Sequence, residues 1–113
     1  MTQPSGEADS ASQARIKQIR SLLDRNPDDT FPHYALAMEL KSQGCLEAAL
    51  ESLDRCLSLD PKYGYAWYHK AAILKDAGRT DEAREVLHRG LEVASKDGQD
   101  QAANEIRDLL ETL

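Results

Sequence analysis

Cysteine, aromatic residues and long apolar runs are all scarce in this chain of 113 residues. Its two cysteines, Cys45 and Cys56, stand eleven positions apart. On one helix this spacing separates them by roughly 16 Å, which is too far for a disulfide within the chain. Two cysteines also cannot supply a four-cysteine zinc cluster. Because only 5% of the residues are aromatic, the core must consist mainly of Leu and Ala, a composition that favours close-packed helices over a sheet.

Charge and hydropathy exclude further classes of partner and location. The net charge is −6, so neither nucleic acid nor an anionic membrane surface is an expected partner. Residues 1–13 contain no apolar run, which argues against a signal peptide. No stretch reaches the roughly 18 apolar residues that a membrane-spanning helix needs. We therefore expect a soluble protein in the cytoplasm.

Catalytic and metal-binding patterns are missing as well. The three histidines, His33, His69 and His88, have no metal-ligand spacing with one another, with a cysteine or with an acidic cluster. The glycines are scattered singly, so there is no phosphate-binding loop, and no Gly-x-Ser-x-Gly nucleophile motif occurs. Acidic pairs such as Asp28-Asp29 precede expected helices, where they complement the helix dipole. The sequence thus predicts a protein that is not an enzyme and that needs no cofactor and no metal.

What the chain does contain is an internal repeat of 34 residues. Pro27 and Pro61, each after an amide or acidic residue, are 34 positions apart. When residues 30–63 are aligned with residues 64–97, eleven positions are identical. These pairs are Tyr34/Tyr68, Ala37/Ala71, Leu40/Leu74, Lys41/Lys75, Gly44/Gly78, Ala49/Ala83, Glu51/Glu85, Leu53/Leu87, Arg55/Arg89, Leu57/Leu91 and Lys62/Lys96. Because the apolar residues of each copy recur with helical spacing, we interpret the repeat as one helical hairpin that occurs twice.

Each repeat predicts two helices, and one further helix is predicted on either side. Gly44 and Gly78 end the first helix of each hairpin, and Thr30 and Thr80 are candidate N-caps. The predicted helices span residues 13–25, 31–43, 46–59, 65–77, 81–96 and 100–112. We expect a disordered tail over residues 1–12 and one domain over residues 13–113. Within that domain we distinguish an N-terminal capping helix (13–26), two repeats (30–63 and 64–97) and a C-terminal capping helix (98–113).

The repeat resembles the tetratricopeptide repeat family, whose unit is a helix–turn–helix of 34 residues. The residues at the positions of the family pattern are His33 (in place of Trp), Leu36-Ala37, Leu40, Ala49, Leu53 and Pro61 in the first repeat and Trp67, Ala71, Leu74, Ala83 and Leu87 in the second. Lys70 departs from the pattern at an apolar position. Gly90 stands where Ala is usual, which we expect to weaken its helix, and Ser95 replaces a proline, so that helix should continue to about Lys96. The resemblance implies an all-α fold of about six helices, with antiparallel hairpins stacked as a short right-handed superhelix.

The resemblance also implies a site. In this family the first helices of the hairpins line the concave face of the superhelix, which binds a peptide or a partner helix. This places nine residues in a peptide-binding groove: Phe31, Tyr34, Met38, Lys41, Tyr65, Tyr68, His69, Ala72 and Lys75. An aromatic surface edged by Lys41 and Lys75 suits a peptide with apolar anchors and an acidic flank. Alternatively, Tyr34 and Tyr68 pack against the next hairpin and do not line a groove.

Two functions remain open at this stage. The first is an adaptor or scaffold that binds a protein or peptide, and the second is a structural unit that self-associates as a homodimer. The last helix distinguishes them, because apolar residues there that do not cap the array would invite a symmetric contact. Those residues are Ile106, Leu109, Leu110 and Leu113. Family members that grip chaperone tails hold the terminal carboxylate with Lys and Asn. Here Tyr34, Met38 and His69 stand at such positions, so we expect no carboxylate-clamp ligand and a monomer or weak homodimer.

Overall fold

The described part of the chain folds into six helices joined by short turns. The computed structural model describes the backbone of residues 6–113 and the side chains from Ser10 onward. Those residues form only helices and turns, and the helices are α1 (Gly6–Arg25), α2 (Thr30–Ser42), α3 (Leu46–Leu59), α4 (Gly64–Asp76), α5 (Thr80–Lys96) and α6 (Asp100–Glu111). The all-α fold of stacked hairpins is confirmed, and five of the six helices match their predicted bounds to within one residue at each end.

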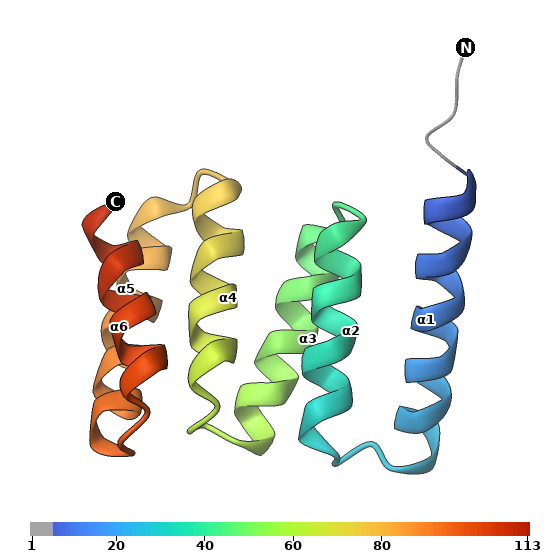
Figure 1. Cartoon of the computed structure of the whole chain (residues 1–113), viewed down its shortest axis with the longest axis horizontal. Coiled ribbons are helices and arrows are strands. Elements are labelled where there is room, and N and C mark those ends of the chain that lie inside the picture. The colour runs from blue at the N-terminus through green and yellow to red at the C-terminus, as the bar shows by residue number, and fades with distance from the viewer. Residues whose placement is uncertain (1–5) are drawn as a thin grey trace.

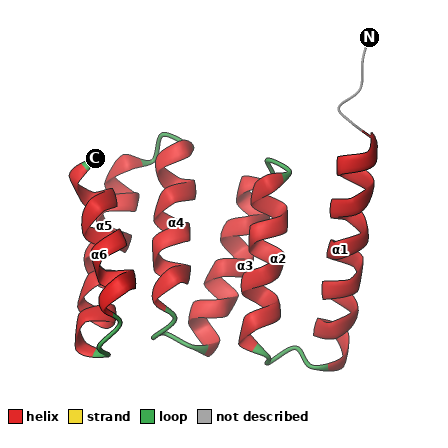
Figure 2. Ribbon diagram, in the orientation of Figure 1, coloured by secondary structure: helices red, strands yellow, loops and turns green. Residues whose placement is uncertain are grey.

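Figure 1 shows the helices following one another from α1 on one side to α5 and α6 on the other, with α2 drawn over α3 and α6 over α5. Helices α2 and α3 form the first hairpin and α4 and α5 the second; α1 lies at one end of the row, and α6 packs on α4 and α5 at the other. The green connections in Figure 2 are short, which forces consecutive helices to run antiparallel. The hairpins stack as a helical repeat superhelix.

Glycine ends three of the helices in the left-handed conformation. Gly44 and Gly78 both have φ of 78°, and Gly98 has φ of 71°. The amide that follows each glycine donates back across the last helical turn, as Cys45 N–H does to the Leu40 carbonyl at 2.9 Å. This arrangement satisfies carbonyls that the helix end leaves free. The prediction that these glycines end helices is therefore confirmed.

The helix starts differ from the predicted N-caps. Thr30 and Thr80 are the first helical residues, and the N-cap positions fall on Asp29 and Arg79, neither of which makes a side-chain cap hydrogen bond. Cys45, which was expected on one helix with Cys56, is the N-cap of α3 and does not lie within that helix. Helices in a folded protein are stabilised mainly by the apolar surface that they bury, so these helices form without side-chain caps.

Small residues allow the helices to approach closely at the centre of each hairpin. Ala37, Ala49, Ala71 and Ala83 are all fully buried, so a larger side chain at any of them would hold two helices apart. Around them the largest fully buried side chains are those of Leu53, Ile73, Leu87, Ile106 and Cys56. The core is therefore aliphatic, as the shortage of aromatic residues predicted.

Trp67 and Gly90 form a complementary pair where α4 crosses α5. The Trp67 ring is buried, and its Nε1–H donates to the Pro61 carbonyl at 2.8 Å. A Cβ atom at Gly90 would lie 2.5 Å from the Trp67 Cβ and 2.9 Å from its Cγ. The absence of a side chain at Gly90 is thus what lets the tryptophan backbone approach. Gly90 was expected only to weaken its helix. Its low helix propensity is accompanied here by a close contact with Trp67 that a larger residue would prevent.

The first repeat has a smaller version of the same arrangement. His33 occupies the position equivalent to Trp67, and its Nε2 lies 2.7 Å from the Pro27 carbonyl. The two polar contacts span the same sequence separation of six residues. The equivalent of Gly90 is Cys56, which is fully buried. The first repeat therefore has a smaller ring at the position of Trp67 and a larger residue at the position of Gly90.

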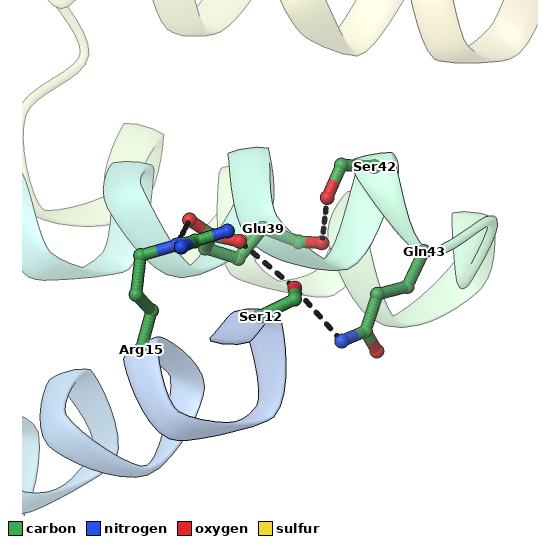
Figure 3. A network of polar contacts seen from close by, with 5 residues as sticks. All are labelled: Ser12, Arg15, Glu39, Ser42 and Gln43. Atoms are coloured by element: carbon green, nitrogen blue, oxygen red, sulfur yellow. Dashed lines mark hydrogen bonds and ion pairs between the residues drawn. The ribbon is translucent and has the colours of Figure 1, made fainter. Parts of the chain in front are cut away.

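Helix α1 begins earlier than predicted, and polar contacts join it to α2. Ser12 is buried; its hydroxyl donates to Glu39 at 2.9 Å and accepts from the Gln43 side-chain amide at 2.8 Å. Arg15 pairs with the same glutamate (Figure 3). Helix α1 thus includes residues 6–12, which were expected to belong to a disordered tail, and the buried Ser12 lies on the helix face that carries Ile16. Residues 1–5 of that tail lie outside the described residues.

The opposite end of the row is closed by α6. As the Ser95 substitution predicted, α5 continues to Lys96. In α6, Ala102, Ala103 and Ile106 are buried, whereas Leu109 and Leu110, together with Leu113 after the helix end, are partly buried against the core. The apolar residues of the last helix are thus taken up largely by packing onto the second hairpin. At the α1 end, by contrast, Leu22 remains 50% exposed.

Candidate functional site

Aromatic side chains gather where the first helices of the two hairpins meet. The Tyr34 ring of α2 stacks on Tyr63, which precedes α4, with ring centroids 5.0 Å apart. Tyr34 also meets His69 of α4 edge-on, with ring centroids 5.8 Å apart. Phe31 and Tyr68 extend this group, at 6.4 Å from Tyr34 and 5.1 Å from His69 respectively. We call these five residues the aromatic cluster; its contacts join the two hairpins.

Within the aromatic cluster, burial differs strongly from one ring to the next. Phe31 is 62% exposed, whereas Tyr34 is partly buried against the core. Burial, reinforced by the neighbouring Tyr63, raises the pKa of Tyr34 to about 12. Its hydroxyl therefore stays protonated and remains a hydrogen-bond donor. Tyr34 thus packs between hairpins, and the exposed ring beside it is that of Phe31.

His69 occupies the middle of this region and carries an unpartnered polar atom. Burial lowers its pKa below the ordinary value, the charge of Lys41 lowers it further, and Glu105 of α6 acts in the opposite direction. The imidazole is therefore neutral near physiological pH. Its Nδ1 is buried without a hydrogen-bond partner.

Glu105 brings α6 into the same region. Hydrogen bonding to the Glu105 carboxylate raises the pKa of the Tyr65 hydroxyl, and burial adds to that shift. The second carboxylate oxygen of Glu105, Oε2, is buried without a hydrogen-bond partner. The region around the aromatic cluster therefore includes residues of α2, α4 and α6.

The other predicted groove residues lie on the same two helices but make fewer direct contacts with the aromatic cluster. Lys75 donates from Nζ to the Thr112 hydroxyl at 3.0 Å, which links α4 to α6. Lys41 acts electrostatically on His69. Met38 and Ala72 are partly buried side chains of α2 and α4. The structure thus brings together Phe31, Tyr34, Tyr68 and His69 in ring contacts and Tyr65 with Glu105, but shows no comparable contact for Met38 or Ala72.

The sequence analysis missed two residues of this region, Tyr63 and Glu105. Tyr63 was assigned to the end of the first repeat, although an aromatic residue directly before a helix that lines a predicted surface is a usable signal. Glu105 lies in α6, outside the two aligned repeats, so the alignment gave no position for it. The structure adds Tyr63 through its stacking on Tyr34, and it adds Glu105 because it places α6 against α4.

Polar cavities and charged side chains occupy a different part of the surface. A cavity of about 330 Å³ lies between α3 and α5, where Lys70 pairs with Asp54 and Arg79 pairs with Glu47 and Glu82. None of the nine predicted groove residues lines it. Over residues 6–113, no group of three His, Cys, Asp or Glu side chains is arranged to hold a metal ion. None of the described helices is long and apolar enough to span a membrane.

Comparison with known proteins gives one consistent family. The family model for the tetratricopeptide repeat matches residues 40–105. A tetratricopeptide repeat-containing protein of Pseudomonas aeruginosa is 30% identical over 98 residues, which is 87% of this chain and 93% of that protein. An uncharacterized protein of Methanocaldococcus jannaschii is 38% identical over 71 residues, which is 63% of this chain and 83% of that protein.

Solved structures agree with the fold. A tetratricopeptide repeat domain protein from Salinibacter ruber superimposes with a TM-score of 0.72 at 30% identity, over 77% of this chain and 88% of that one. The type III secretion chaperone SycD of Yersinia enterocolitica, in complex with a peptide of the translocator YopD, superimposes with a TM-score of 0.82 at 20% identity. That match covers 92% of this chain and 80% of SycD.

Proposed function

Because this chain belongs to the tetratricopeptide repeat family, which generally serves protein interaction and not catalysis, we propose that it binds an extended peptide of a partner protein across α2 and α4. The observation that carries the proposal is the aromatic cluster, which spans both hairpins and ends in the exposed ring of Phe31. Aromatic side chains offer large, rigid contact areas with polar tips, which suits recognition of peptide side chains.

The side chains of this surface indicate which peptide sequences it would bind. The rings of Phe31 and Tyr68 would take apolar anchor residues of the peptide, while Lys41 and Lys75 favour an acidic flank. Two hairpins provide less area than a standard interface, so the dissociation constant should be on the order of micromolar or weaker. The peptide-bound structure of SycD, a protein of the same fold, supports this mode of use. The nine predicted groove residues remain part of this proposal.

The proposal excludes the chaperone-tail ligand of some family members. A carboxylate clamp needs Lys and Asn side chains that donate to the terminal carboxylate. At such positions this chain has Tyr34, Met38 and His69, and His69 is neutral near physiological pH because burial lowers its pKa. We therefore expect internal peptide segments, and not C-terminal tails, to be the ligands.

Self-association is the second candidate, and Leu22 is the observation that favours it. The α1 end of the row leaves this side chain 50% exposed, on a face of α1 that also carries Ala14, Lys17, Gln18, Ser21 and Arg25. A second copy of the chain that covered this end would bury Leu22 in a symmetric contact. The two candidates therefore use different surfaces, which makes them separable by mutation.

A matched pair of substitutions distinguishes them. Phe31 and Leu22 are both large, exposed apolar residues, so replacing either by Ser should leave the helical circular dichroism unchanged. Peptides are first selected from a random display library on the wild-type protein, and their dissociation constants are measured by fluorescence anisotropy. Phe31→Ser should weaken binding at least about tenfold, which is 1.4 kcal/mol, whereas Leu22→Ser should not.

The mass of the protein in solution and the location of the bound peptide complete the test. Light scattering that shows a dimer in the wild type and a monomer in Leu22→Ser would support self-association. Amide chemical-shift changes that cluster on α3 and α5, around Glu47, Asp54 and His88, would contradict the proposed surface. A wild-type protein that selects no peptide at all would contradict the peptide-binding function.

A further inference from the structure

The two ends of the row of helices carry opposite charges. From residue 14 to residue 25, α1 has four basic residues and one acidic residue, a net charge of +3, and its other acidic residues precede this part of the helix. Helix α6 has four acidic residues and one basic residue, a net charge of −3. The basic residues of α1 are Arg15, Lys17, Arg20 and Arg25, and the acidic residues of α6 are Asp100, Glu105, Asp108 and Glu111. The α1 end is thus a basic region in a chain whose net charge is −6.

Most of these charged side chains are exposed and have no ion-pair partner. The exposed ones are Lys17, Arg20 and Arg25 in α1 and Asp100, Asp108 and Glu111 in α6. The ion pairs formed within the described residues use none of these six side chains. Both ends of the row can therefore use their charges in a contact with another molecule.

The exposed Leu22 indicates what kind of element would cover α1. Residues 12–25 lie 34 positions before α3, so α1 corresponds to the second helix of a hairpin. Leu22 is then equivalent to Cys56 and Gly90. Cys56 is fully buried, and Gly90 packs against Trp67 on the first helix of its own hairpin. Leu22, which is 50% exposed, therefore lies where the first helix of a hairpin would pack.

Helix α6 is a helix of that kind. It follows α5, the second helix of the second hairpin, and packs on α4 and α5, so it has the place of the first helix of a further hairpin. If α1 of a second copy packed beside it, first and second helices would continue to alternate along the row. Figure 1 shows that α1 and α6 run in opposite directions. A copy added along the row would thus place the two helices antiparallel, as consecutive helices are throughout the fold.

The charges of the two helices also have matching spacing. Lys17 and Arg25 are eight residues apart on the face of α1 that carries Leu22. Asp100 and Asp108 of α6 are eight residues apart as well. Eight residues extend roughly 12 Å along a helix. In an antiparallel contact, Arg25 opposite Asp100 would therefore bring Lys17 opposite Asp108.

A contact between two α1 helices lacks this complementarity, because it would bring the basic residues of both copies together. We propose that this chain self-associates head to tail, with α1 of one copy packed on α6 of the next. The contact would bury Leu22 and pair the exposed charges. Because it uses a different surface on each copy, it leaves one α1 and one α6 uncovered and can be repeated into short open assemblies. This inference rests on self-association, the second candidate function, and gives α6 as the partner surface.

Sedimentation velocity and light scattering of the wild-type protein provide the first test. Between about 10 μM and about 1 mM protein, the weight-average mass should rise from the 12.6 kDa of the monomer to values above that of a dimer. Raising the salt concentration from about 0.05 M to about 0.5 M should lower the association constant about tenfold, because salt screens exposed charges. A mass that stays at the monomer value at every protein concentration would overturn the proposal.

Charge reversals at the two ends provide the second test. The α1 variant is Lys17→Glu with Arg25→Glu, and the α6 variant is Asp100→Lys with Asp108→Lys. Each variant alone should associate at least about tenfold more weakly than the wild type, because its two ends have charges of the same sign. An equimolar mixture of the two variants should associate again, because each provides the charge that the other lacks.

A matched control reverses two charges away from both ends. Arg55→Glu with Lys62→Glu changes exposed positions and should leave the association constant unchanged. Circular dichroism checks the fold of every variant, and the concentration and salt series need only the wild-type protein. An α6 variant that associates like the wild type would overturn the proposal in favour of a symmetric contact. A mixture that does not associate, or a control that loses association, would also overturn it.

The peptides selected on the wild-type protein separate this inference from peptide binding. Both charge-reversal variants should bind them with unchanged affinity, because the substituted positions lie outside the aromatic cluster. If the wild-type protein binds peptides but stays monomeric, the head-to-tail contact is wrong and the peptide-binding function stands. If the protein assembles but selects no peptide, the head-to-tail contact stands and the peptide-binding function fails.

Discussion

Replacing Gly90 by alanine should destabilise this protein, although the same change in the middle of most helices is stabilising. Gly90 lies within α5, where alanine would gain about 1 kcal/mol in helix propensity. The new Cβ, however, would lie 2.5 Å from the Trp67 Cβ, 2.9 Å from its Cγ and 3.4 Å from the Ile106 Cδ1. The Trp67 Cβ is fixed by the α4 backbone, so no rotation of the side chain relieves the 2.5 Å contact. Relief therefore requires α4 and α5 to separate.

The magnitude follows from these two opposing effects. Overpacking a core by one carbon atom costs about 1–3 kcal/mol, and the rigid contact at Gly90 places the cost in the upper part of that range. After subtraction of the gain in propensity, the free energy of unfolding should fall by about 1–2 kcal/mol. For a domain of this size each kcal/mol changes the melting temperature by roughly 4–8 °C. A decrease of roughly 5–15 °C is expected.

Urea and thermal unfolding followed by far-ultraviolet circular dichroism measure this effect. The control is His88→Ala, an exposed position in the same helix, which should change stability by less than about 0.5 kcal/mol. A Gly90→Ala protein that is more stable than the wild type would refute the argument, because it would mean that helix propensity and not the contact with Trp67 determines the outcome.

Two further predictions concern titratable groups. Burial raises the pKa of the Cys56 thiol to about 11, so a thiol reagent should label exposed Cys45 rapidly and Cys56 only on unfolding; equal rapid labelling in native buffer would contradict the assigned burial. Burial lowers the pKa of His69 below 6.5, so on acidification the unfolded chain binds this proton before the folded chain does. The contribution of His69 to the free energy of unfolding is complete above pH 6.5. It is lost as the pH falls from that value to the lower pKa of the folded state. Urea midpoints should show this loss in the wild type but not in His69→Gln, whereas equal pH dependence in both would contradict it.

The helices were predictable because their signals are local. Periodic apolar residues and the glycines at positions 44 and 78 determine the helices of both hairpins, and the structure confirms these glycines at positive φ. The start of α1 was not predictable in the same way. From the sequence alone, Ser12 is expected to be exposed to solvent. Its burial depends on contacts with Glu39 and Gln43 that exist only after α1 packs on α2.

The candidate site was only partly predictable because α6 does not follow the 34-residue spacing of the repeats. Helix α4 starts 34 residues after α2, at 64 against 30, whereas α6 starts 36 residues after α4, at 100 against 64. The two additional residues arise where Ser95 replaces proline and α5 continues to Lys96. A shift of two positions turns a helix by about 200°, so the repeat alignment could not indicate which side chain of α6 faces α4. The contribution of Glu105 therefore emerged only from the structure.

The complementary sizes at the α4–α5 crossing also constrain how the two repeats can diverge or be exchanged. In the second repeat a tryptophan faces a glycine, whereas the equivalent positions of the first repeat hold His33 and Cys56. A recombinant that joined the first helix of one repeat to the second helix of the other would place Trp67 against a cysteine side chain or His33 against a glycine. One product would be overfilled and the other would contain a void. The unit that can be duplicated or grafted as a module is therefore the whole hairpin, and the two positions within it must change together.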